Sequence, residues 1–329
     1  MISEKDFHSF LAKERKIIDA KLKKVLANRK PRSLYEPSNY ILADQGKRLR
    51  PLLVLLSAKA VAGTYKNAYN AALAIEMLHN FTLVHDDIMD NADKRRNKLT
   101  VHVKYDVNTA ILAGDGLLAV AYEYLLKDLV IPGNDVVKYF TKGLVEVCEG
   151  QSLDKEFELK RSVSIDEYIV MITKKTAAMA EMCCAIGAKI GGGSSKEVQA
   201  LSLYGKNLGI AFQIQDDLLD IVGEEDSFGK KIGGDLIEGK KTFLFLKALE
   251  KAKGKEKAAL IKVIANKGIS PGEVSGYKNI YQELGVLVDA QNEIVKFTRK
   301  ALRQIVHIKN ENDKQLFTFL AHSLIKRTK

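Results

Sequence analysis

The 329-residue chain has no tryptophan, only five prolines and only three cysteines. Few prolines leave long segments free to be helical, because proline ends or kinks a helix. The cysteines, Cys148, Cys183 and Cys184, are odd in number and lack both paired spacing and a histidine partner. That pattern gives neither a disulfide framework nor a zinc site. We expect all three to be small buried residues in a reducing compartment.

Long apolar runs are also missing. No stretch reaches the roughly 18 uninterrupted apolar residues that indicate a membrane-spanning helix. The N-terminal sequence MISEKDFHSFLAKERKII is charged from Glu4 onward and lacks the apolar core of a signal peptide. We therefore expect no membrane span and a cytoplasmic location.

The charge balance is strongly basic. Lys and Arg number 52 against 41 Asp and Glu, giving a formal net charge of +11. This surplus is compatible with nucleic acid, an anionic membrane surface, an anionic substrate or simply a solvated basic surface. No nucleic-acid-binding motif accompanies it, so we expect no nucleic-acid partner.

Helical periodicity dominates the pattern of apolar residues. Residues 68–90 place Ala72, Ile75, Leu78 and Phe81 on one stripe, and residues 109–127 and 201–222 are nearly apolar all round, as in central helices. No window shows the alternation of a sheet. The sequence predicts an all-α fold in a single domain, 1–329. Its expected loops are 91–100, the region of Pro132 and Gly133, 191–195, 223–241 and 268–272.

Two aspartate motifs are the most informative feature. Residues 84–96 read VHDDIMDNADKRR, and residues 214–220 read IQDDLLD. Two DDxxD patterns in this length have chance odds well below about one in a hundred at average composition. On a helix, the carboxylates of each motif share one face. Clustered carboxylates at the ends of apolar helices must bind a cation or take up protons.

The chemistry of the ligands selects the cation. Oxygen ligands without His or Cys suit Mg²⁺, with Mn²⁺ as the alternative. Mg²⁺ uses one or two carboxylates and completes its shell with waters and substrate phosphates. Two aspartate clusters therefore predict two or three Mg²⁺ ions that bind a polyphosphate. The competing interpretation is a pair of solvated acidic helix ends.

Basic motifs alternate with the acidic ones along the chain. Each is compatible with a solvated surface, but Arg and Lys also provide bidentate and point-charge contacts to phosphate. The basic motifs are GKRLRP at 46–51, Arg95–Arg96, KKT at 174–176, GKKIGGD at 229–235 and EGKKT at 238–242.

Together these motifs resemble the trans-isoprenyl diphosphate synthases, the polyprenyl synthetase family. The resemblance covers nearly the whole chain, and the uninterrupted HDDIMD is most similar to short-chain enzymes of the archaeal geranylgeranyl diphosphate synthase type. It implies an isoprenoid-synthase-type helical bundle around a deep central cavity, usually a homodimer. The implied reaction joins isopentenyl diphosphate to an allylic diphosphate. The motifs that carry the resemblance are GKRLRP, LVHDDIMDNADKRR, TVHVKYDVNTAILAGD, KKT, FQIQDDLLD and GKKIGGDLIEGKKT.

The resemblance also implies roles for particular residues. The metal ligands would be Asp86, Asp90 and Asp216, with Asp220, Asp87 and Asp217 as less certain ligands or supporting groups. The isopentenyl diphosphate would be held by Lys47, Arg50, His79 and Arg96. The allylic diphosphate would be held by Arg95, Lys175, Thr176, Gln213, Lys230 and Lys240. Asp86, Asp90, Lys175 and Asp216 would be the catalytic residues, and either Lys230 or Lys231 would reach the phosphate.

Product length depends on the space below the first aspartate motif. Phe81 lies five residues before Asp86, roughly 7.5 Å along a helix axis, and Thr82 is adjacent. In the family, a single aromatic residue at the position farther from the motif, here Phe81, is typical of enzymes that make the C20 product. Phe81 would then cap the cavity, although a plain core residue is the competing interpretation.

Three alternatives remain open. A farnesyl diphosphate synthase or a bifunctional C15/C20 synthase would use the same motifs. A terpene cyclase is disfavoured because Lys47, Arg50 and Arg96 predict a second diphosphate site. A non-catalytic partner subunit is disfavoured because both aspartate motifs are intact.

Overall fold

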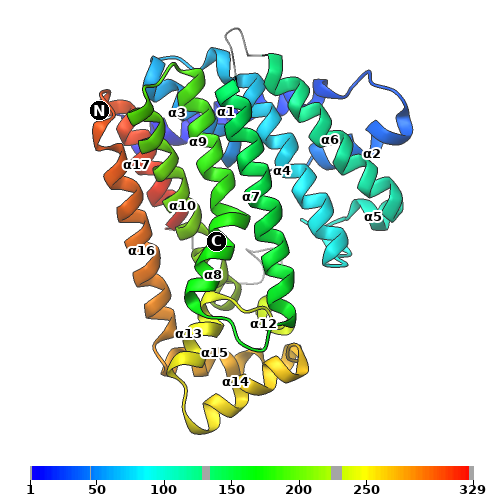
Figure 1. Cartoon of the computed structure of the whole chain (residues 1–329), viewed down its shortest axis with the longest axis vertical. Coiled ribbons are helices and arrows are strands. Elements are labelled where there is room, and N and C mark those ends of the chain that lie inside the picture. The colour runs from blue at the N-terminus through cyan, green and yellow to red at the C-terminus, as the bar shows by residue number, and fades with distance from the viewer. Residues whose placement is uncertain (1, 45, 128–133, 224–231, 326–329) are drawn as a thin grey trace. The chain divides into compact units, whose positions relative to one another are not determined.

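A computed structural model describes residues 2–44, 46–127, 134–223 and 232–325 (Figure 1). The described chain is almost entirely helical, which confirms the all-α prediction. It divides into two compact units, unit 1 (residues 1–140, 183–201 and 307–317) and unit 2 (residues 141–182, 202–306 and 318–329). The expectation of a single domain stays a prediction.

The elements follow the helical periodicity of the sequence. Unit 1 contains α1 (Glu4–Val25), α2 (Arg32–Leu42), α3 (Leu49–Ala62), η1 (Lys66–Ala68), α4 (Tyr69–Met89), β1 (Lys94–Arg95), β2 (Lys98–Leu99), α5 (Val101–Lys104) and α6 (Val107–Lys127). Unit 2 contains α8 (Ile165–Ile172), η2 (Thr173–Ala177), α12 (Gly234–Ile237), α13 (Phe243–Lys251), α14 (Gly254–Asn266), η3 (Pro271–Glu273), α15 (Val274–Glu283) and α16 (Val286–Gln304). Residues of both units occur in α7 (Asn134–Leu159), α9 (Ala178–Ile190), α10 (Ser195–Val222), η4 (Ile305–His307) and α17 (Glu311–Ile325).

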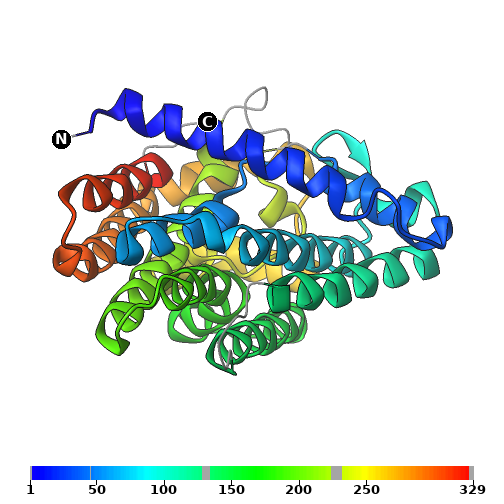
Figure 2. The same cartoon turned by 90° about the horizontal axis from the view of Figure 1, so that it is seen from above.

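The centre of unit 1 is α4. Every residue from Ala71 to Leu78 is buried, as expected of a helix that is apolar on all sides. It packs against α3 and lies along α6, its neighbour in Figure 1. In Figure 2, α1 lies along α3 and α4. This packing fixes the end of α4 that carries the first aspartate motif.

Unit 2 has its own core. Tyr168 of α8, Ile214 of α10 and Tyr281 of α15 belong to one buried cluster, together with the first turn of α13, where Phe243 to Leu246 are all buried. The second aspartate motif, at the end of α10, rests on this cluster.

Three details differ from the sequence predictions. The 91–100 loop contains the antiparallel pair β1–β2. Cys148 is exposed on α7, whereas Cys183 and Cys184 are buried as expected. The predicted loop at 223–241 contains the short helix α12, and its residues 224–231 lie outside the described residues.

The outer face of α6 is the fourth difference. This helix was expected to be central, but Leu112 is 60% exposed, and Val107, Ile111 and Leu126 of the same helix are also exposed. Its inner face, which includes Ala113 and Leu117, is buried. Because both faces are apolar, the sequence could not distinguish them. By length and composition alone, α6 could cross a membrane, although it packs within unit 1.

Candidate active site

The first aspartate motif lies at the C-terminal end of α4. Asp86 is half-buried and Asp90, the residue that caps the helix, is exposed. The main-chain N–H of Asp90 donates to the carbonyl of Asp86 over 2.9 Å, so helical geometry extends through both residues. The last turn contains no basic residue. Carboxylates at the C-terminal end of a helix interact unfavourably with the helix dipole and so destabilise the helix. The same negative charge favours the binding of a cation.

Asp87, the middle residue of this motif, faces inward. Its side chain is 2% exposed, and Arg95 of β1 donates from Nε to its Oδ1 over 2.8 Å, while Nη2 lies 2.7 Å from the same oxygen. The other oxygen, Oδ2, is buried and has no hydrogen-bond partner in the described structure. Asp87 therefore positions Arg95 and is poorly placed to share a metal with Asp86 and Asp90.

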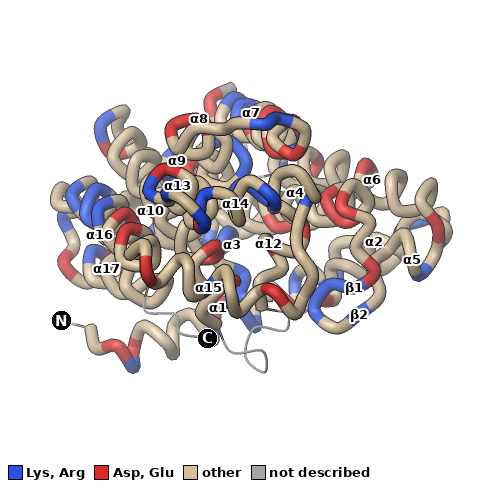
Figure 3. The backbone as a smooth tube through the Cα atoms, turned by 90° about the horizontal axis from the view of Figure 1, so that it is seen from below, with Lys and Arg blue, Asp and Glu red and all other residues tan. Residues whose placement is uncertain are grey.

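The β1–β2 hairpin positions the two arginines. Its turn consists of Arg96 and Asn97, whose φ angles are +51° and +63°. Two consecutive left-handed residues are typical of a two-residue hairpin turn, and Asn tolerates this backbone better than most residues. The hairpin is a basic segment in Figure 3. It places the Arg96 guanidinium beside Gly46, where a Cβ atom would lie 3.2 Å from Arg96 Nη1.

Arg48 in GKRLRP is buried and serves the structure. Its Nε donates to Asp19 of α1 over 2.8 Å, and its Nη1 donates to Glu76 of α4 over 2.5 Å. Nη2 donates to the carbonyls of Leu42 and Asp44. Although burial opposes its charge, these carboxylates raise the pKa of Arg48. Arg48 thus fixes the loop before α3, which carries Lys47, and the first turn of α3, which carries Arg50.

A cationic cluster surrounds His79. Arg50 Nη1 lies 3.1 Å from His79 Nε2. Burial, and after it the charges of nearby arginines, lower the pKa of His79 well below its ordinary value. His79 is therefore neutral at neutral pH and, as Arg50 can only donate, its proton is on Nδ1. That nitrogen is buried and unpartnered among the residues described. The contributing arginines are, in order, Arg50, Arg96, Arg95 and Arg48.

Unit 1 therefore gathers three of the four residues predicted to hold isopentenyl diphosphate, namely Arg50, His79 and Arg96. Lys47 is exposed and adjacent in sequence to Arg48. Arg48 and Arg95 are paired with carboxylates, and the positive charges of Arg50 and Arg96 near the neutral imidazole attract an anion. This part of unit 1 is well suited to a diphosphate.

The second aspartate motif repeats the pattern of the first. Asp216 and Asp220 are half-buried, whereas Asp217 is 5% exposed. Asp217 accepts hydrogen bonds from the Tyr168 hydroxyl (2.5 Å), Gln213 Nε2 (3.0 Å) and the main-chain N–H of Phe243 (3.2 Å). In both motifs, the middle aspartate is turned into the protein.

Electrostatics around Asp217 act in opposite directions. Burial and, after it, repulsion by Asp235 raise the pKa of Asp217 above its ordinary value. The hydrogen bonds from Tyr168 and Gln213 oppose this change because they stabilise the carboxylate. Burial also raises the pKa of Tyr168 well above its ordinary value, which keeps its hydroxyl protonated as a donor.

Asp220 is tied to the residues that begin α12. The main-chain N–H of Asp235 donates to its Oδ2 over 3.1 Å, and the N–H of Gly233 donates to its carbonyl over 2.7 Å. Burial, and after it the charges of nearby aspartates that include Asp235, raises the pKa values of Tyr168 and Tyr281. Sequence reasoning noted Asp235 only for its lysine neighbours. The sequence signal that could have identified Asp235 was its position in a GGD segment soon after the second aspartate motif.

The KKT residues form a π-helical turn, η2, between α8 and α9. Lys175 pairs with Asp154 of α7, and Lys174 pairs with Glu149. Gly150 of α7 makes room for the turn, because a Cβ atom there would lie 2.1 Å from the main-chain nitrogen of Lys175. π-Helical turns are rare overall, and many of those that occur lie at functional sites. The sequence predicted a helix at these residues but not the π-helical turn within it.

Of the remaining residues of unit 2 that were predicted to bind the allylic diphosphate, some lie within the described residues and others do not. The Thr176 hydroxyl donates to Gln213 Oε1 over 2.8 Å, which joins η2 to α10. Lys240 Nζ lies 2.6 Å from Glu238 Oε2. Lys230 and its alternative, Lys231, lie outside the described residues.

The predicted chain-length residues lie one turn before the first motif. Phe81 is half-buried and absent from the buried core, and its ring lies 4.6 Å from the ring of His85. The Thr82 hydroxyl donates to the carbonyl of His79 over 2.8 Å. His85 fits against Gly114 of α6, where a Cβ atom would lie 2.3 Å from its ring. This contact gives His85 a packing role.

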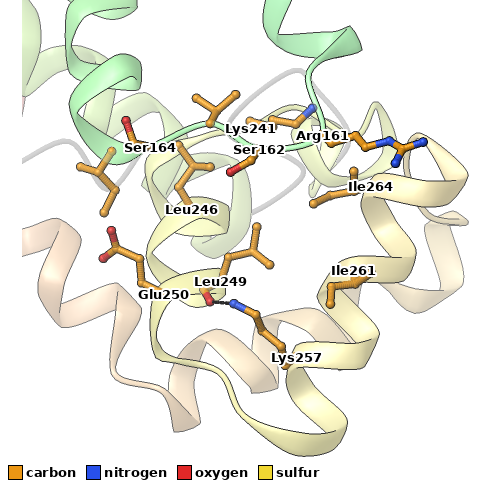
Figure 4. Close-up of a pocket in the computed structure, with 12 residues that line it drawn as sticks. Arg161, Ser162, Ser164, Lys241, Leu246, Leu249, Glu250, Lys257, Ile261 and Ile264 are labelled. Carbon is orange, nitrogen blue, oxygen red and sulfur yellow. Dashed lines mark hydrogen bonds between the residues drawn. The ribbon is translucent and has the colours of Figure 1, made fainter.

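A separate cavity of about 400 Å³ lies between the 161–165 segment, α13 and α14 (Figure 4). Its wall mixes apolar residues, such as Leu246, Leu249 and Ile264, with polar and charged ones, and Lys257 donates to the carbonyl of Leu249 within it. None of the aspartates of either motif lines this cavity. It is thus distinct from the predicted catalytic residues.

Metal binding can be tested against the side chains present. In the described parts of the chain, no three His, Cys, Asp or Glu side chains form a closed metal site. Mg²⁺ does not require one, because waters and substrate phosphates complete its shell. Asp86 with Asp90, and Asp216 with Asp220, supply oxygen ligands that fit this chemistry. Donors occupy both oxygens of Asp217 and one oxygen, Oδ1, of Asp87.

Comparison with known proteins agrees with these observations. A family model described as polyprenyl synthetase matches residues 31–284. The chain belongs to the polyprenyl synthetase family. It is accordingly a prenyltransferase that elongates prenyl chains.

Individual members of the polyprenyl synthetase family match over most of the chain. The geranylgeranyl diphosphate synthase of Sulfolobus acidocaldarius is 40% identical, covering 90% of this chain and 91% of the relative. The geranylfarnesyl diphosphate synthase of Natronomonas pharaonis is 33% identical over 100% of both chains. The crystal structure of geranylgeranyl pyrophosphate synthetase from Pyrococcus horikoshii has a TM-score of 0.90 at 35% identity, covering 98% of this chain and 99% of that one.

Proposed function

We propose that this polyprenyl synthetase is a Mg²⁺-dependent geranylgeranyl diphosphate synthase. It would condense isopentenyl diphosphate with dimethylallyl, geranyl or farnesyl diphosphate. The observation that carries the proposal is the cationic cluster of Arg50 and Arg96 around neutral His79, in the same unit as Asp86 and Asp90. One unit thereby offers two ways to bind phosphate, through arginines directly and through carboxylates with a metal.

The chemistry follows from ionisation of the allylic diphosphate. Bound Mg²⁺ would withdraw charge from the leaving diphosphate. Asp86, Asp90, Asp216 and Asp220 would hold the two or three ions, and Lys175 would stabilise the diphosphate directly. Arg50 and Arg96 would fix isopentenyl diphosphate so that its double bond reaches the allylic carbon. The departed diphosphate would accept the proton that is lost last.

Product length is the finer part of the proposal. Phe81 is half-buried, as expected of a side chain that limits a cavity, and Thr82 leaves space beside it. Relatives named for geranylgeranyl and for geranylfarnesyl diphosphate both match this chain, so likeness alone does not set the length. A farnesyl or bifunctional C15/C20 synthase is the alternative.

We also propose a homodimer in the cytoplasm. The exposed apolar residues Ile111, Leu112 and Leu126 of α6 suit contact with a second copy of the chain. Analytical ultracentrifugation should show twice the monomer mass, and Leu112→Glu should shift the sample toward monomer.

The decisive experiment is incubation with Mg²⁺, labelled isopentenyl diphosphate and each allylic primer in turn, followed by measurement of chain length. We expect mainly C20 product and its loss in EDTA. Mainly C15 product would favour the alternative. No condensation with any primer would contradict the proposal and favour a non-catalytic partner subunit.

A further inference from the structure

A chain of hydrogen bonds joins η2, α10 and the start of α13 in unit 2. It runs from the Thr176 hydroxyl to Gln213 Oε1, then from Gln213 Nε2 to Asp217 Oδ1. At its far end, the main-chain N–H of Phe243 and the Tyr168 hydroxyl both reach Asp217 Oδ2. Both Thr176 and Gln213 are predicted contacts of the allylic diphosphate.

The main-chain N–H of Phe243 fixes the direction of this chain. A main-chain N–H can only donate, so the atom of residue 217 that faces it must accept. The carboxylate of Asp217 accepts at both oxygens, so Gln213 must present its NH₂ group to Asp217. The opposite end of the same amide, Oε1, then faces Thr176, whose hydroxyl hydrogen is used in donating to it.

This direction decides which group can donate to a phosphate. Thr176 has one hydroxyl hydrogen and it is already used, whereas the amide nitrogen of Gln213 carries a second hydrogen. That second hydrogen has no partner among the described residues, and Gln213 is only half-buried. A phosphate oxygen needs donors and is repelled by lone pairs. Gln213 is thus the better donor of the two.

We infer that Asp217 is a positioning residue that orients Gln213 as the side-chain donor to the allylic diphosphate and prevents Thr176 from taking that role. The inference rests on the proposed function, since it concerns the diphosphate of that reaction. It gives the middle aspartate of the second motif a role that requires no metal.

The substitution Asp217→Asn reverses the direction. The oxygen of the introduced amide must face the N–H of Phe243, so its NH₂ group faces Gln213. The Gln213 amide then turns over, accepts from that NH₂ group and donates to the Thr176 oxygen. The Thr176 hydroxyl hydrogen is released toward the phosphate. The substitution is almost isosteric, so it changes polarity more than shape.

Binding of Mg²⁺ and inorganic diphosphate, measured by calorimetry, provides the test. In the wild-type background, Gln213→Met should raise the dissociation constant about tenfold or more, a larger effect than that of Thr176→Val. In the Asp217→Asn background, Thr176→Val should become the more harmful change. The same order in both backgrounds would overturn the inference.

Tyr168→Phe is the matched control. It removes a buried donor to the same oxygen of Asp217 but leaves the N–H of Phe243, so the order of the two effects should stay as in the wild type. Reversal in Tyr168→Phe as well would mean that loosened packing causes it, and would also overturn the inference. Thermal unfolding should first establish that each variant is folded. Failure of the wild-type protein to bind diphosphate at all would instead contradict the proposed function.

Discussion

Arg95 directs two nitrogens at one oxygen of Asp87, with Nε donating over 2.8 Å and Nη2 at 2.7 Å. This pair separates the three carboxylates of the first motif by role. Asp87 is buried and paired, and Asp86 and Asp90 are more accessible.

The first prediction follows from that separation. Asp86→Asn should lower kcat/KM by roughly 10²–10³-fold and raise the Mg²⁺ concentration needed for half-maximal rate, because it removes a proposed metal ligand. Asp87→Asn should leave that Mg²⁺ concentration close to the wild-type value while weakening the contact with Arg95. Rates measured across a Mg²⁺ titration test this, with exposed Asp93→Asn as the control. Equal shifts for Asp86→Asn and Asp87→Asn would contradict the division of roles.

The second prediction concerns Arg48. Arg48→Met should lower the free energy of unfolding by about 3–5 kcal/mol, because it leaves the carboxylate of Glu76 buried without its charge partner. Arg15→Met is the matched control, since Arg15 lies 3.9 Å from Asp19 in a partly exposed pair. It should cost less than about 1 kcal/mol. Urea unfolding measures both, and a similar cost for the two variants would show that Arg48 has no special structural role.

The third prediction concerns the glycine beside the π-helical turn. Gly150→Ala should destabilise the protein by about 1–3 kcal/mol and lower activity, because its Cβ atom would overlap the main chain at Lys175. Gly276→Ala in α15 meets nothing within 4 Å and should be neutral or stabilising by up to about 1 kcal/mol. Chemical unfolding and steady-state kinetics provide the comparison. Full activity in Gly150→Ala would argue against a catalytic need for the turn.

The fourth prediction is a pH dependence. Burial, then Arg50 and the other arginines, lower the pKa of His79 in the folded protein, whereas the unfolded chain has a value of about 6.5. Below that pH the unfolded state binds the proton and the folded state does not. His79 therefore reduces stability as the pH falls below about 6.5, by at most about 1.4 kcal/mol per pH unit.

His79→Gln removes this titration. Between pH 7.5 and 5, the wild-type protein should therefore lose more unfolding free energy than His79→Gln does. Parallel stability curves for the two proteins would mean that His79 is readily protonated in the folded state.

The fifth prediction concerns product length. Phe81→Ala should shift the product beyond C20, since it removes the ring that would limit the cavity, and Thr82→Phe should shift it toward C15. Chromatography of dephosphorylated products measures the distribution. An unchanged product from Phe81→Ala would show that Phe81 is a packing residue only.

The sequence determined the family, the all-α fold and the two acidic and several basic motifs, because helical spacing and residue chemistry are local properties. It placed α4 and the last turns of α10 almost to the residue, since their apolar faces and aspartates recur at helical intervals.

Only the tertiary structure decided how those motif residues divide their tasks. Which aspartate of each DDxxD faces inward depends on donors far away in the sequence, such as Tyr168 and Phe243 for Asp217. Arg48 is structural because α1 and α4 bring carboxylates to it. The outer face of α6 is exposed although its composition is that of a core helix. Burial and charge pairing arise from neighbours distant in the sequence, and a local pattern does not contain them.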